Sequence, residues 1–305
     1  MKQESPRTCE NEVQAKPELN CITASLVTYG NSPQEIGDLL QSVRASESVR
    51  QVVVIDNSSC ESLRSCVESY GAEYIRMNRN VGFGAGHNFA IKKHCRPAKY
   101  HLVVNPDISC DPEVLDSLYR FMEEHPDVGL VMPRILYPDG SEQRLCKQLP
   151  SPLDLFVRRF LGSSLFKAQR ARYELRHLDM DKPREVPCLS GCFMLLRSSA
   201  LREIGGFDER YFMYMEDFDL CRRIAAKYKT VYYPEVSVTH GYAKGSYRNP
   251  KLLAYHLRSS FRYFGKWGWI LDSERKKLNR KTSLLLSEQQ GLDDSALTEC
   301  RGRES

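Results

Sequence analysis

Apolar, β-branched runs alternate with amphipathic helical patterns through the first 125 residues of this 305-residue chain. Continuous apolar strands separated by helices are typical of a parallel sheet that helices cover on both faces. We therefore expect an α/β fold built on a mostly parallel central sheet. The expected strands are Cys21–Thr28, Gln51–Ile55, Glu73–Arg76 and Tyr100–Val104, and the expected helices run from Pro33 through Val43, on to about Tyr70, over Ala85–Lys93 and from Pro112 to Glu124.

Four polar or glycine-rich loops follow the carboxyl ends of these strands. In open α/β sheets, ligands bind beyond these strand ends, so the four loops are expected to converge on one edge. Asp56, at the tip of the second strand, is a natural acceptor for a base N–H or a ribose hydroxyl. The loops are Thr28–Asn31, Asp56–Asn57, Asn78–Asn88 and Asn105–Asp107.

The middle of the chain is less regular. Its patterns predict a turn at Tyr137–Gly140 between short antiparallel strands, a basic helical stretch over Pro150–Leu178, an apolar segment at Cys188–Leu196 that contains Gly191, and a strand at Thr230–Tyr233 before His240 and a glycine-rich loop.

Three carboxylates stand at the start of a predicted helix, directly after an aromatic run: Glu216, Asp217 and Asp219. Asp217 falls on the apolar helix face and should point inward, where burying a carboxylate is costly unless a cation or a reaction uses it. Asp219 should lie on the surface and pair with Arg222 or Arg223. The alternative is that these acids only complement the helix dipole. We favour Asp217 as a catalytic base, and its place near a helix N-terminus predicts a low pKa.

Asp107 and His240 each follow a strand, and each has two interpretations. Asp107 could bind a divalent metal or cap a turn, and His240 could be a ligand or a structural histidine. The Gly82, Gly84 and Gly86 spacing resembles a dinucleotide-binding fingerprint, but it follows the third strand instead of the first. We therefore interpret this loop as a flexible wall whose backbone faces a nucleotide or sugar, with Asn80 and Asn88 as hydrogen-bond donors.

Composition limits the location of the protein. The eleven cysteines are scattered without a CxxC spacing, which favours reduced thiols in the cytoplasm. Residues 1–20 lack the apolar core of a signal peptide, and no apolar run reaches the roughly 20 residues that span a bilayer. We expect a cytoplasmic protein, in solution or at the inner face of the plasma membrane. The net charge of +5 is mild, and we expect no nucleic-acid partner.

Taken in order, these motifs resemble those of the family 2 glycosyltransferases with the GT-A fold, in particular the bacterial rhamnosyltransferase-like branch. The resemblance covers about Ile22 to Phe264. It implies a Rossmann-like sheet with a small antiparallel sheet and a C-terminal helical region. The motifs are Val27–Tyr29, Val54–Ser59, Asn80–Phe83 with Asn88, Asn105–Asp107, Gly205–Glu209, Glu216–Leu220 and His240.

The resemblance implies an inverting transfer of a sugar from a nucleotide-diphosphate donor to a glycan or lipid-linked hydroxyl in bacterial cell-surface polysaccharide synthesis. dTDP-rhamnose is the first choice of donor and UDP-sugars the second. Asn105 stands where the family's DXD motif has its first Asp, so a single carboxylate would hold the metal weakly. The implied roles are donor binding for Thr28, Tyr29, Asp56, Asn80, Gly82, Phe83, Asn88 and Asn105; Mg²⁺ or Mn²⁺ binding for Asp107 and His240; catalysis for Asp217, with Glu216 as the substitute base; and acceptor binding for Gly191 and Glu216.

We divide the chain into a disordered tail over 1–19, a GT-A domain over 20–265, and a basic C-terminal helix or tail over 266–305. The aromatic stretch Tyr263–Trp269 and the Lys/Arg run after it predict either an interfacial membrane segment or aromatics packed on the domain. Two rival functions remain. A sugar-phosphate nucleotidyltransferase would need a basic glycine-rich loop after the first strand, which is absent, and a catalytically silent nucleotide-sugar-binding protein has no need of an inward Asp217.

Overall fold

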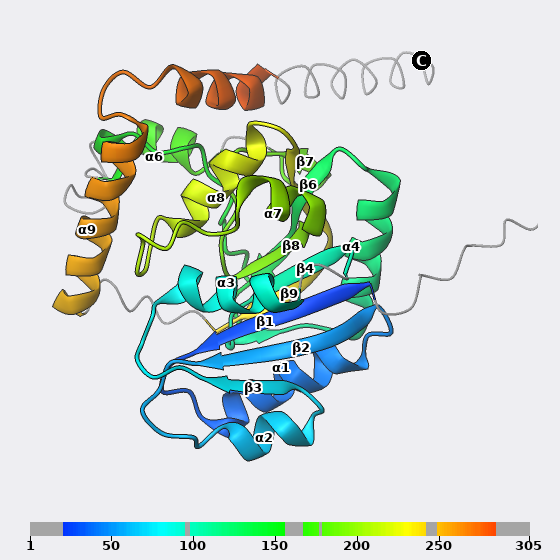
Figure 1. Cartoon of the computed structure of the whole chain (residues 1–305). Coiled ribbons are helices and arrows are strands. Elements are labelled where there is room, and N and C mark those ends of the chain that lie inside the picture. Colours follow the sequence, from blue (N-terminus) through cyan, green and yellow to red (C-terminus); the bar gives the residue numbers. More distant parts are fainter. Residues whose placement is uncertain (1–20, 95–97, 156–166, 177–178, 242–248, 285–305) are drawn as a thin grey trace, which may run out of the picture.

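The computed structural model describes residues 21–94, 98–155, 167–176, 179–241 and 249–284. In this part of the chain one mixed sheet has the strand order β3-β2-β1-β4-β8-β6-β9-β5, with β7 also paired to β9 (Figure 1). Only β8 and the two-residue β5 and β7 run against the other described strands, so the expected mostly parallel α/β fold is confirmed. The strands are β1 (Ile22–Thr28), β2 (Val49–Asp56), β3 (Glu73–Arg76), β4 (Tyr100–Val104), β5 (Ile108–Ser109), β6 (Val128–Leu136), β7 (Arg184–Glu185), β8 (Phe193–Arg197) and β9 (Lys229–His240).

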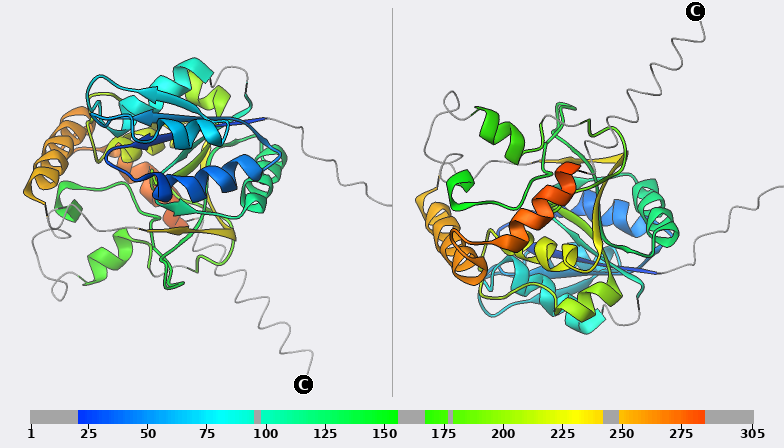
Figure 2. Two further views of the ribbon diagram at one scale, coloured as in Figure 1. Left: turned by 90° about the horizontal axis from the view of Figure 1, so that it is seen from below. Right: turned by 90° about the horizontal axis from the view of Figure 1, so that it is seen from above.

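Helices cover both faces of the sheet (Figures 1 and 2). On one face of the sheet, α1 contacts both α2 and α4, whereas α3, α7 and α8 pack on the other face. Helix α9 lies at the side of the molecule, and a helical segment over residues 273–284 follows it. The helices are α1 (Pro33–Ala45), α2 (Arg64–Ser69), α3 (Phe83–His94), α4 (Pro112–Glu124), α6 (Lys167–Tyr173), α7 (Ser198–Ile204), α8 (Glu216–Ala225) and α9 (Pro250–Trp267).

The strand order reverses at β1, which pairs with β2 on one side and with β4 on the other. A crevice forms at such a switch point, outside the carboxyl ends of the strands. Because β8 is antiparallel, its first residue, Phe193, lies opposite Val104 at this same edge. The last residue of β9, His240, pairs with Ile108 and so brings a fourth chain segment to the edge. The expected convergence of the strand-end loops is confirmed.

A chain of polar side chains lies inside the otherwise apolar core. The hydroxyl of Ser25 on β1 contacts both His87 Nδ1 at 2.7 Å and His101 Nε2 at 2.8 Å. His101 in turn contacts the Thr23 hydroxyl through Nδ1 at 2.9 Å. All four residues are buried, and burial lowers the pKa of His87 well below its ordinary value, which keeps the ring neutral. Hydrogen bonds within the chain offset the cost of burying these groups between α3, β1 and β4.

Several sequence-based boundaries differ from the structure. Helix α3 begins at Phe83, two residues before the prediction, and β9 continues well beyond the predicted Thr230–Tyr233. Strand β6, which was not expected, leads into the predicted turn and pairs in parallel with β9. Only an isolated antiparallel bridge, Leu136 to Glu142, closes that turn within the described residues. The antiparallel pairs belong to the main sheet and not to a separate small one.

Of the predicted basic helix over 150–178, the structure describes helical turns at 152–155 and 167–173, and residues 156–166 and 177–178 lie outside the description. The predicted tail over 1–19, the glycine-rich loop beyond Gly241 and the last part of the C-terminal segment, 285–305, lie outside it too.

The described part of the predicted C-terminal tail, residues 266–284, is attached to the α/β domain. Arg222 of α8 is 2% exposed and forms two hydrogen bonds to Asp272, at 2.8 and 2.6 Å. The Trp267 ring lies under the same guanidinium, 4.1 Å from ring centroid to Cζ. A buried, doubly hydrogen-bonded pair leaves a costly unpaired charge if either partner is removed. The domain therefore does not end at residue 265 as predicted.

Candidate active site

Asp56 ends β2 directly beside the end of β1. Its side chain is fully buried, and Oδ1 accepts hydrogen bonds from the Thr28 hydroxyl at 3.3 Å and the Ser58 amide at 2.8 Å. Oδ2 accepts a hydrogen bond from the Tyr74 hydroxyl at 2.8 Å. In this conformation Asp56 fixes the loops at the crevice, and Tyr29, which is 67% exposed, is the predicted donor residue that a ligand can reach there.

Hydrogen bonds hold the glycine loop, residues 78–88, which we predicted to be a flexible wall of the site. Asn57 binds this loop twice. Its Oδ1 accepts a hydrogen bond from the Val81 amide at 3.2 Å, and its Nδ2 donates to the Gly82 carbonyl at 3.4 Å. Asn80 Oδ1 accepts from the Gly82 amide at 2.9 Å. Gly82 has φ of +90°, and a Cβ there would lie 2.1 Å from the Phe212 carbonyl oxygen. Only glycine fits this position.

Asn88 has a structural role that the sequence did not indicate. It is 2% exposed, its Nδ2 donates to the Phe207 carbonyl at 2.8 Å, and its Oδ1 accepts from the Phe207 amide at 2.8 Å. Glu209 Oε1 accepts a further hydrogen bond from Nδ2 at 2.9 Å. This geometry does not support Asn88 as a donor ligand, because its amide already joins α3 to the Gly205–Glu209 segment.

Asp107 and His240 come together because β5 and β9 pair at this point. His240 Nε2 lies 3.4 Å from Asp107 Oδ1, and the Gly241 amide donates to the Asp107 carbonyl at 2.9 Å. Gln143 sets the histidine tautomer: its Nε2 donates to the His240 and Leu136 carbonyls, so its Oε1 faces Nδ1 at 2.9 Å and requires an N–H there. In the neutral ring, Nε2 then presents a lone pair toward a carboxylate.

Two acceptors that face each other fit a divalent cation, for which histidine nitrogen and carboxylate oxygen are ordinary ligands. Within the described ranges no cluster of three His, Cys, Asp or Glu residues could hold a metal. Asp107 and His240 could thus supply only part of a coordination shell, and oxygen atoms of a substrate would have to complete it. The side chain of Asp107 is 39% exposed and accessible to such a ligand.

One turn, Gly191–Cys192, lies between this pair and the carboxylates of α8. The Gly191 amide donates to Asp217 Oδ2 at 3.4 Å, and the Asn105 amide donates to the Cys192 carbonyl at 2.9 Å. Burial is the main cause that raises the pKa of the Cys192 thiol, and the charges of Asp107 and Asp217 raise it further. Consecutive residues of one turn therefore contact the predicted base and the strand end that carries the predicted metal ligand.

The backbone before α8 is strained. Tyr214 and Met215 have φ values of +68° and +69°, a left-handed conformation that costs a non-glycine residue about 1–2 kcal/mol. The Phe212 carbonyl accepts from the Phe83 amide at 3.0 Å and so ties this segment to the glycine loop. Such strain persists only where surrounding contacts enforce it, and it clusters at functional sites.

The three carboxylates of α8 lie in three environments. Asp217 is half-buried and faces Gly191, as predicted, with its Oδ1 accepting from the Phe218 amide at 2.9 Å. Burial raises the pKa of Asp217, against the opposing charge of Lys147 and two backbone hydrogen bonds, so the low pKa that we predicted is wrong. Lys147 carries no sequence motif and was not anticipated.

Glu216 is 6% exposed, and burial, with the charge of Asp217, raises its pKa to about 8. Its Oε2 has no hydrogen-bond partner among the described residues. Asp219 is fully buried and not on the surface as predicted. It does bind Arg223, at 2.8 Å, but Arg222 pairs with Asp272 instead.

The profile described as Glycosyl transferase family 2 matches residues 25–205. The chain belongs to glycosyltransferase family 2. It is 32% identical over 260 residues to the N-acetylglucosaminyl-diphospho-decaprenol L-rhamnosyltransferase of Mycobacterium tuberculosis, a match that covers 79% of this chain and 84% of that protein. Rhamnosyltransferase WbbL of Escherichia coli K12 is 29% identical over 253 residues, covering 79% and 91%. The chain is thus a rhamnosyltransferase-like glycosyltransferase.

Solved structures agree on the fold. GalNAc-T7, crystallised with UDP, GalNAc and Mn²⁺, superposes with a TM-score of 0.59 at 15% identity, over 83% of this glycosyltransferase and 49% of that chain. The mannosyltransferase PcManGT of Pyrobaculum calidifontis, in complex with GDP-Man and Mn²⁺, superposes with a TM-score of 0.52 at 17% identity, over 80% and 65%. The GT-A fold is confirmed. In the described ranges, no helix is both long and apolar enough to cross a membrane.

The pKa of Glu216 makes stability depend on pH. Because its folded pKa of about 8 exceeds its ordinary 4.5, stability should fall as pH rises from about 4.5 to 8 and then level off. Glu216→Gln should remove this contribution, which is on the order of a few kcal/mol. We expect urea unfolding to show the free energy of the wild type declining relative to that of Glu216→Gln between pH 5 and pH 9. The exposed Glu47→Gln should follow the wild type, and a constant difference between wild type and Glu216→Gln would contradict the buried, proton-binding Glu216.

Proposed function

We propose that this glycosyltransferase transfers a sugar, with inversion, from a nucleotide-diphosphate donor to a hydroxyl of a glycan or lipid-linked acceptor in bacterial cell-surface polysaccharide synthesis. Rhamnose from dTDP-rhamnose is the first choice of donor, and UDP-sugars are the second. The observation that carries the proposal is the Gly191–Cys192 turn, which contacts both Asp217 and the strand end that leads to Asp107. The names of the mycobacterial and E. coli relatives both support rhamnose, and the mycobacterial name supports a lipid-linked diphosphate acceptor.

Asp217 accepts the proton of the attacking hydroxyl in this proposal. Its raised pKa strengthens it as a base, and Glu216, which holds a proton near neutral pH, leaves Asp217 as the charged member of the pair. The Gly191 amide fixes the carboxylate on the acceptor side of the turn. Inversion follows if the hydroxyl attacks the sugar from the face opposite the leaving diphosphate.

The donor diphosphate lies on the other side of the turn, at Asp107 and His240. A divalent cation, Mg²⁺ or Mn²⁺, bound there would neutralise the charge that develops on the leaving group. Tyr29 reaches the donor base, while Thr28 and Asp56 hold its loop. Gly82 and Phe83 shape the wall between donor and acceptor, since the Phe83 ring would lie 3.3 Å from a Cβ at position 191.

Asp217→Asn removes the proton acceptor and keeps the size of the side chain. General-base assistance is worth about 10²- to 10⁴-fold, so we expect kcat to fall by at least that lower factor, with donor affinity unchanged. Initial rates of sugar transfer and calorimetric titration with the donor measure the two quantities. Transfer by Asp217→Asn within tenfold of the wild type would contradict the assignment of the base.

Asp107→Ala tests the proposed cation site. Wild-type affinity for the donor should rise with Mn²⁺, and in Asp107→Ala this gain should fall by about tenfold or more, because half of the protein's ligand set is lost. Calorimetry with and without Mn²⁺ measures the gain. Asp111→Ala, which removes an exposed carboxylate four residues along the chain, should keep it. The same donor affinity with and without Mn²⁺ in the wild type would refute a metal at Asp107.

Attachment to the inner face of the plasma membrane is the remaining part of the proposal. Trp267 packs on the domain, but Phe261, Trp269, Ile270 and Leu271 are 63%, 43%, 80% and 88% exposed. Arg258, one helical turn before Phe261, is exposed as well. An exposed apolar patch with a nearby cation suits an anionic bilayer surface.

Because residues 266–272 hold α8 in place, point variants test this patch better than truncation. Ile270→Ser/Leu271→Ser should reduce co-sedimentation with phosphatidylglycerol vesicles by about fivefold or more, since the variant lacks two exposed apolar side chains that would enter the bilayer. Phe89→Ser, at a 43% exposed position on α3, is the control and should bind as the wild type does. Equal binding of all three proteins would exclude this patch as the membrane contact.

A further inference from the structure

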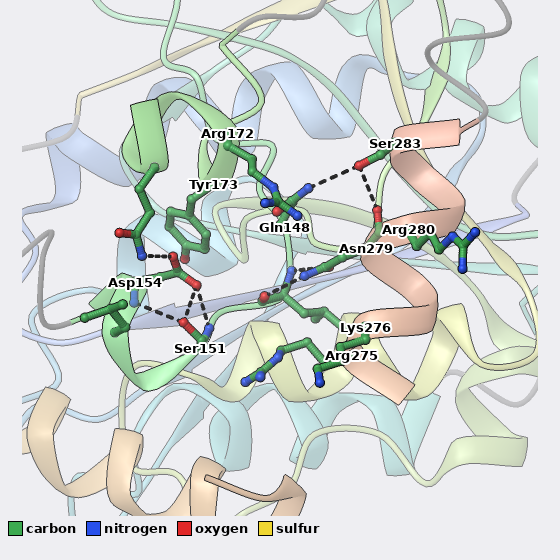
Figure 3. A pocket seen from close by; sticks show the side chains of 13 residues that line it. Gln148, Ser151, Asp154, Arg172, Tyr173, Arg275, Lys276, Asn279, Arg280 and Ser283 are labelled. Carbon is green, nitrogen blue, oxygen red and sulfur yellow. Dashed lines mark hydrogen bonds between the residues drawn. The ribbon is translucent and has the colours of Figure 1, made fainter. Parts of the chain in front are cut away.

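A second cavity lies apart from the strand-end crevice. It has a volume of about 540 Å³ and opens between α6, the 148–154 segment and the helical segment 273–284 (Figure 3). This volume is within the range of small-molecule sites. Neither Asp107 nor Asp217 lines it.

Positive charge dominates this cavity. Arg172, Arg275, Lys276 and Arg280 line it, against a single carboxylate, Asp154. That carboxylate is already hydrogen-bonded: Oδ2 accepts from the amide and hydroxyl of Ser151, at 2.8 and 2.6 Å, and Oδ1 accepts from a side-chain amide of α6 at 2.9 Å. In Figure 3 Arg172 extends from α6 into the space beside the 273–284 helix.

The walls are held by specific contacts. Arg275 is 8% exposed and donates to the Pro150 carbonyl at 3.3 Å. Asn279 pairs with the backbone of Leu149 in both directions, accepting at 2.9 Å and donating at 3.0 Å. The cationic side chains of Arg172 and Lys276 are exposed, and no carboxylate in the described part of the chain pairs with either. A hydrogen-bonded frame therefore presents two cations, Arg172 and Lys276, that have no anionic partner among the described residues.

One short segment connects this cavity with the catalytic residues. Gln143 contacts His240, the charge of Lys147 acts on Asp217, and Gln148 lines the cavity. Five residues of extended chain span at most about 18 Å. Along this segment the order is proposed donor site, proposed base and cavity, so the cavity begins within this distance of the residue that contacts His240.

We propose that the cavity binds a diphosphate group of the acceptor, which rests on the function proposed above. Several guanidinium and ammonium groups around one space suit a polyvalent oxyanion, since arginine binds phosphate oxygens through paired N–H groups. The acceptor then has two anchors, its hydroxyl at Asp217 and its diphosphate at Arg172 and Lys276. The donor diphosphate, held at Asp107 and His240, does not use this cavity.

Binding is tested first without any sugar, with inorganic pyrophosphate as the probe and EDTA present to remove metal from the donor site. Arg172→Gln/Lys276→Gln should weaken calorimetric binding at least tenfold. Lys277→Gln, an exposed position of the same helix that does not line the cavity, should change it less than twofold. Equal binding by wild type and double variant, or an equal loss in Lys277→Gln, would overturn the proposal.

Transfer assays then separate the acceptor from other phosphates. For an acceptor that carries a diphosphate, the double variant should raise the acceptor KM at least tenfold and leave kcat and the donor KM unchanged, whereas an acceptor without phosphate should be used equally by both proteins. The double variant could instead keep its acceptor KM and lose only its binding to phosphatidylglycerol vesicles. In that case the cavity binds lipid headgroups, and the proposal fails. A wild-type protein that transfers sugar to no acceptor would refute the proposed function. The pyrophosphate titration would still show whether the cavity binds a diphosphate, because it does not require transfer.

Discussion

The geometry of the active site depends on the hydrogen bonds that the buried carboxylate of Asp219 accepts. Its fully buried carboxylate accepts hydrogen bonds from Arg223 at 2.8 Å, Lys266 at 2.6 Å and Trp267 Nε1 at 2.9 Å. These partners come from α8 itself and from the end of α9, so one carboxylate fixes the helix against the C-terminal region. Residues two apart on a helix point to nearly opposite sides. Holding Asp219 inward therefore directs Asp217 toward Gly191 and the crevice.

The strained turn before α8 depends on the same anchor. Tyr214 and Met215 remain left-handed because α8 is fixed on one side by Asp219 and the segment before it is fixed by the glycine loop on the other. Loss of either contact would release the strain and move the carboxylates. The C-terminal residues 266–272 are thus needed to place the proposed base, Asp217.

The fold and the glycosyltransferase family could be predicted because they follow from local patterns and motifs. Apolar strands and capped helices define a parallel sheet, and strand ends of such a sheet meet at one edge, which brings Asp107 and His240 together. Contacts distant in sequence could not be predicted. The pKa of Asp217 is set by burial and by the charge of Lys147. The structural role of Asn88 arises from its hydrogen bond to the Phe207 backbone. The basic cavity forms only where the 273–284 helix packs against the rest of the chain. None of these leaves a periodicity or a spacing in the sequence.

The central claim is that Asp107 with His240 binds the donor diphosphate on one side of the Gly191–Cys192 turn, while Asp217 activates the acceptor hydroxyl on the other. A crystal structure with a nucleotide sugar and Mn²⁺, with an anomalous difference map that locates the manganese, tests this claim most directly. We expect a manganese peak between Asp107 Oδ1 and His240 Nε2, the diphosphate next to it, and the anomeric carbon on the side that faces Asp217. A nucleotide or manganese bound elsewhere, for example in the basic cavity beside residues 273–284, would contradict the account.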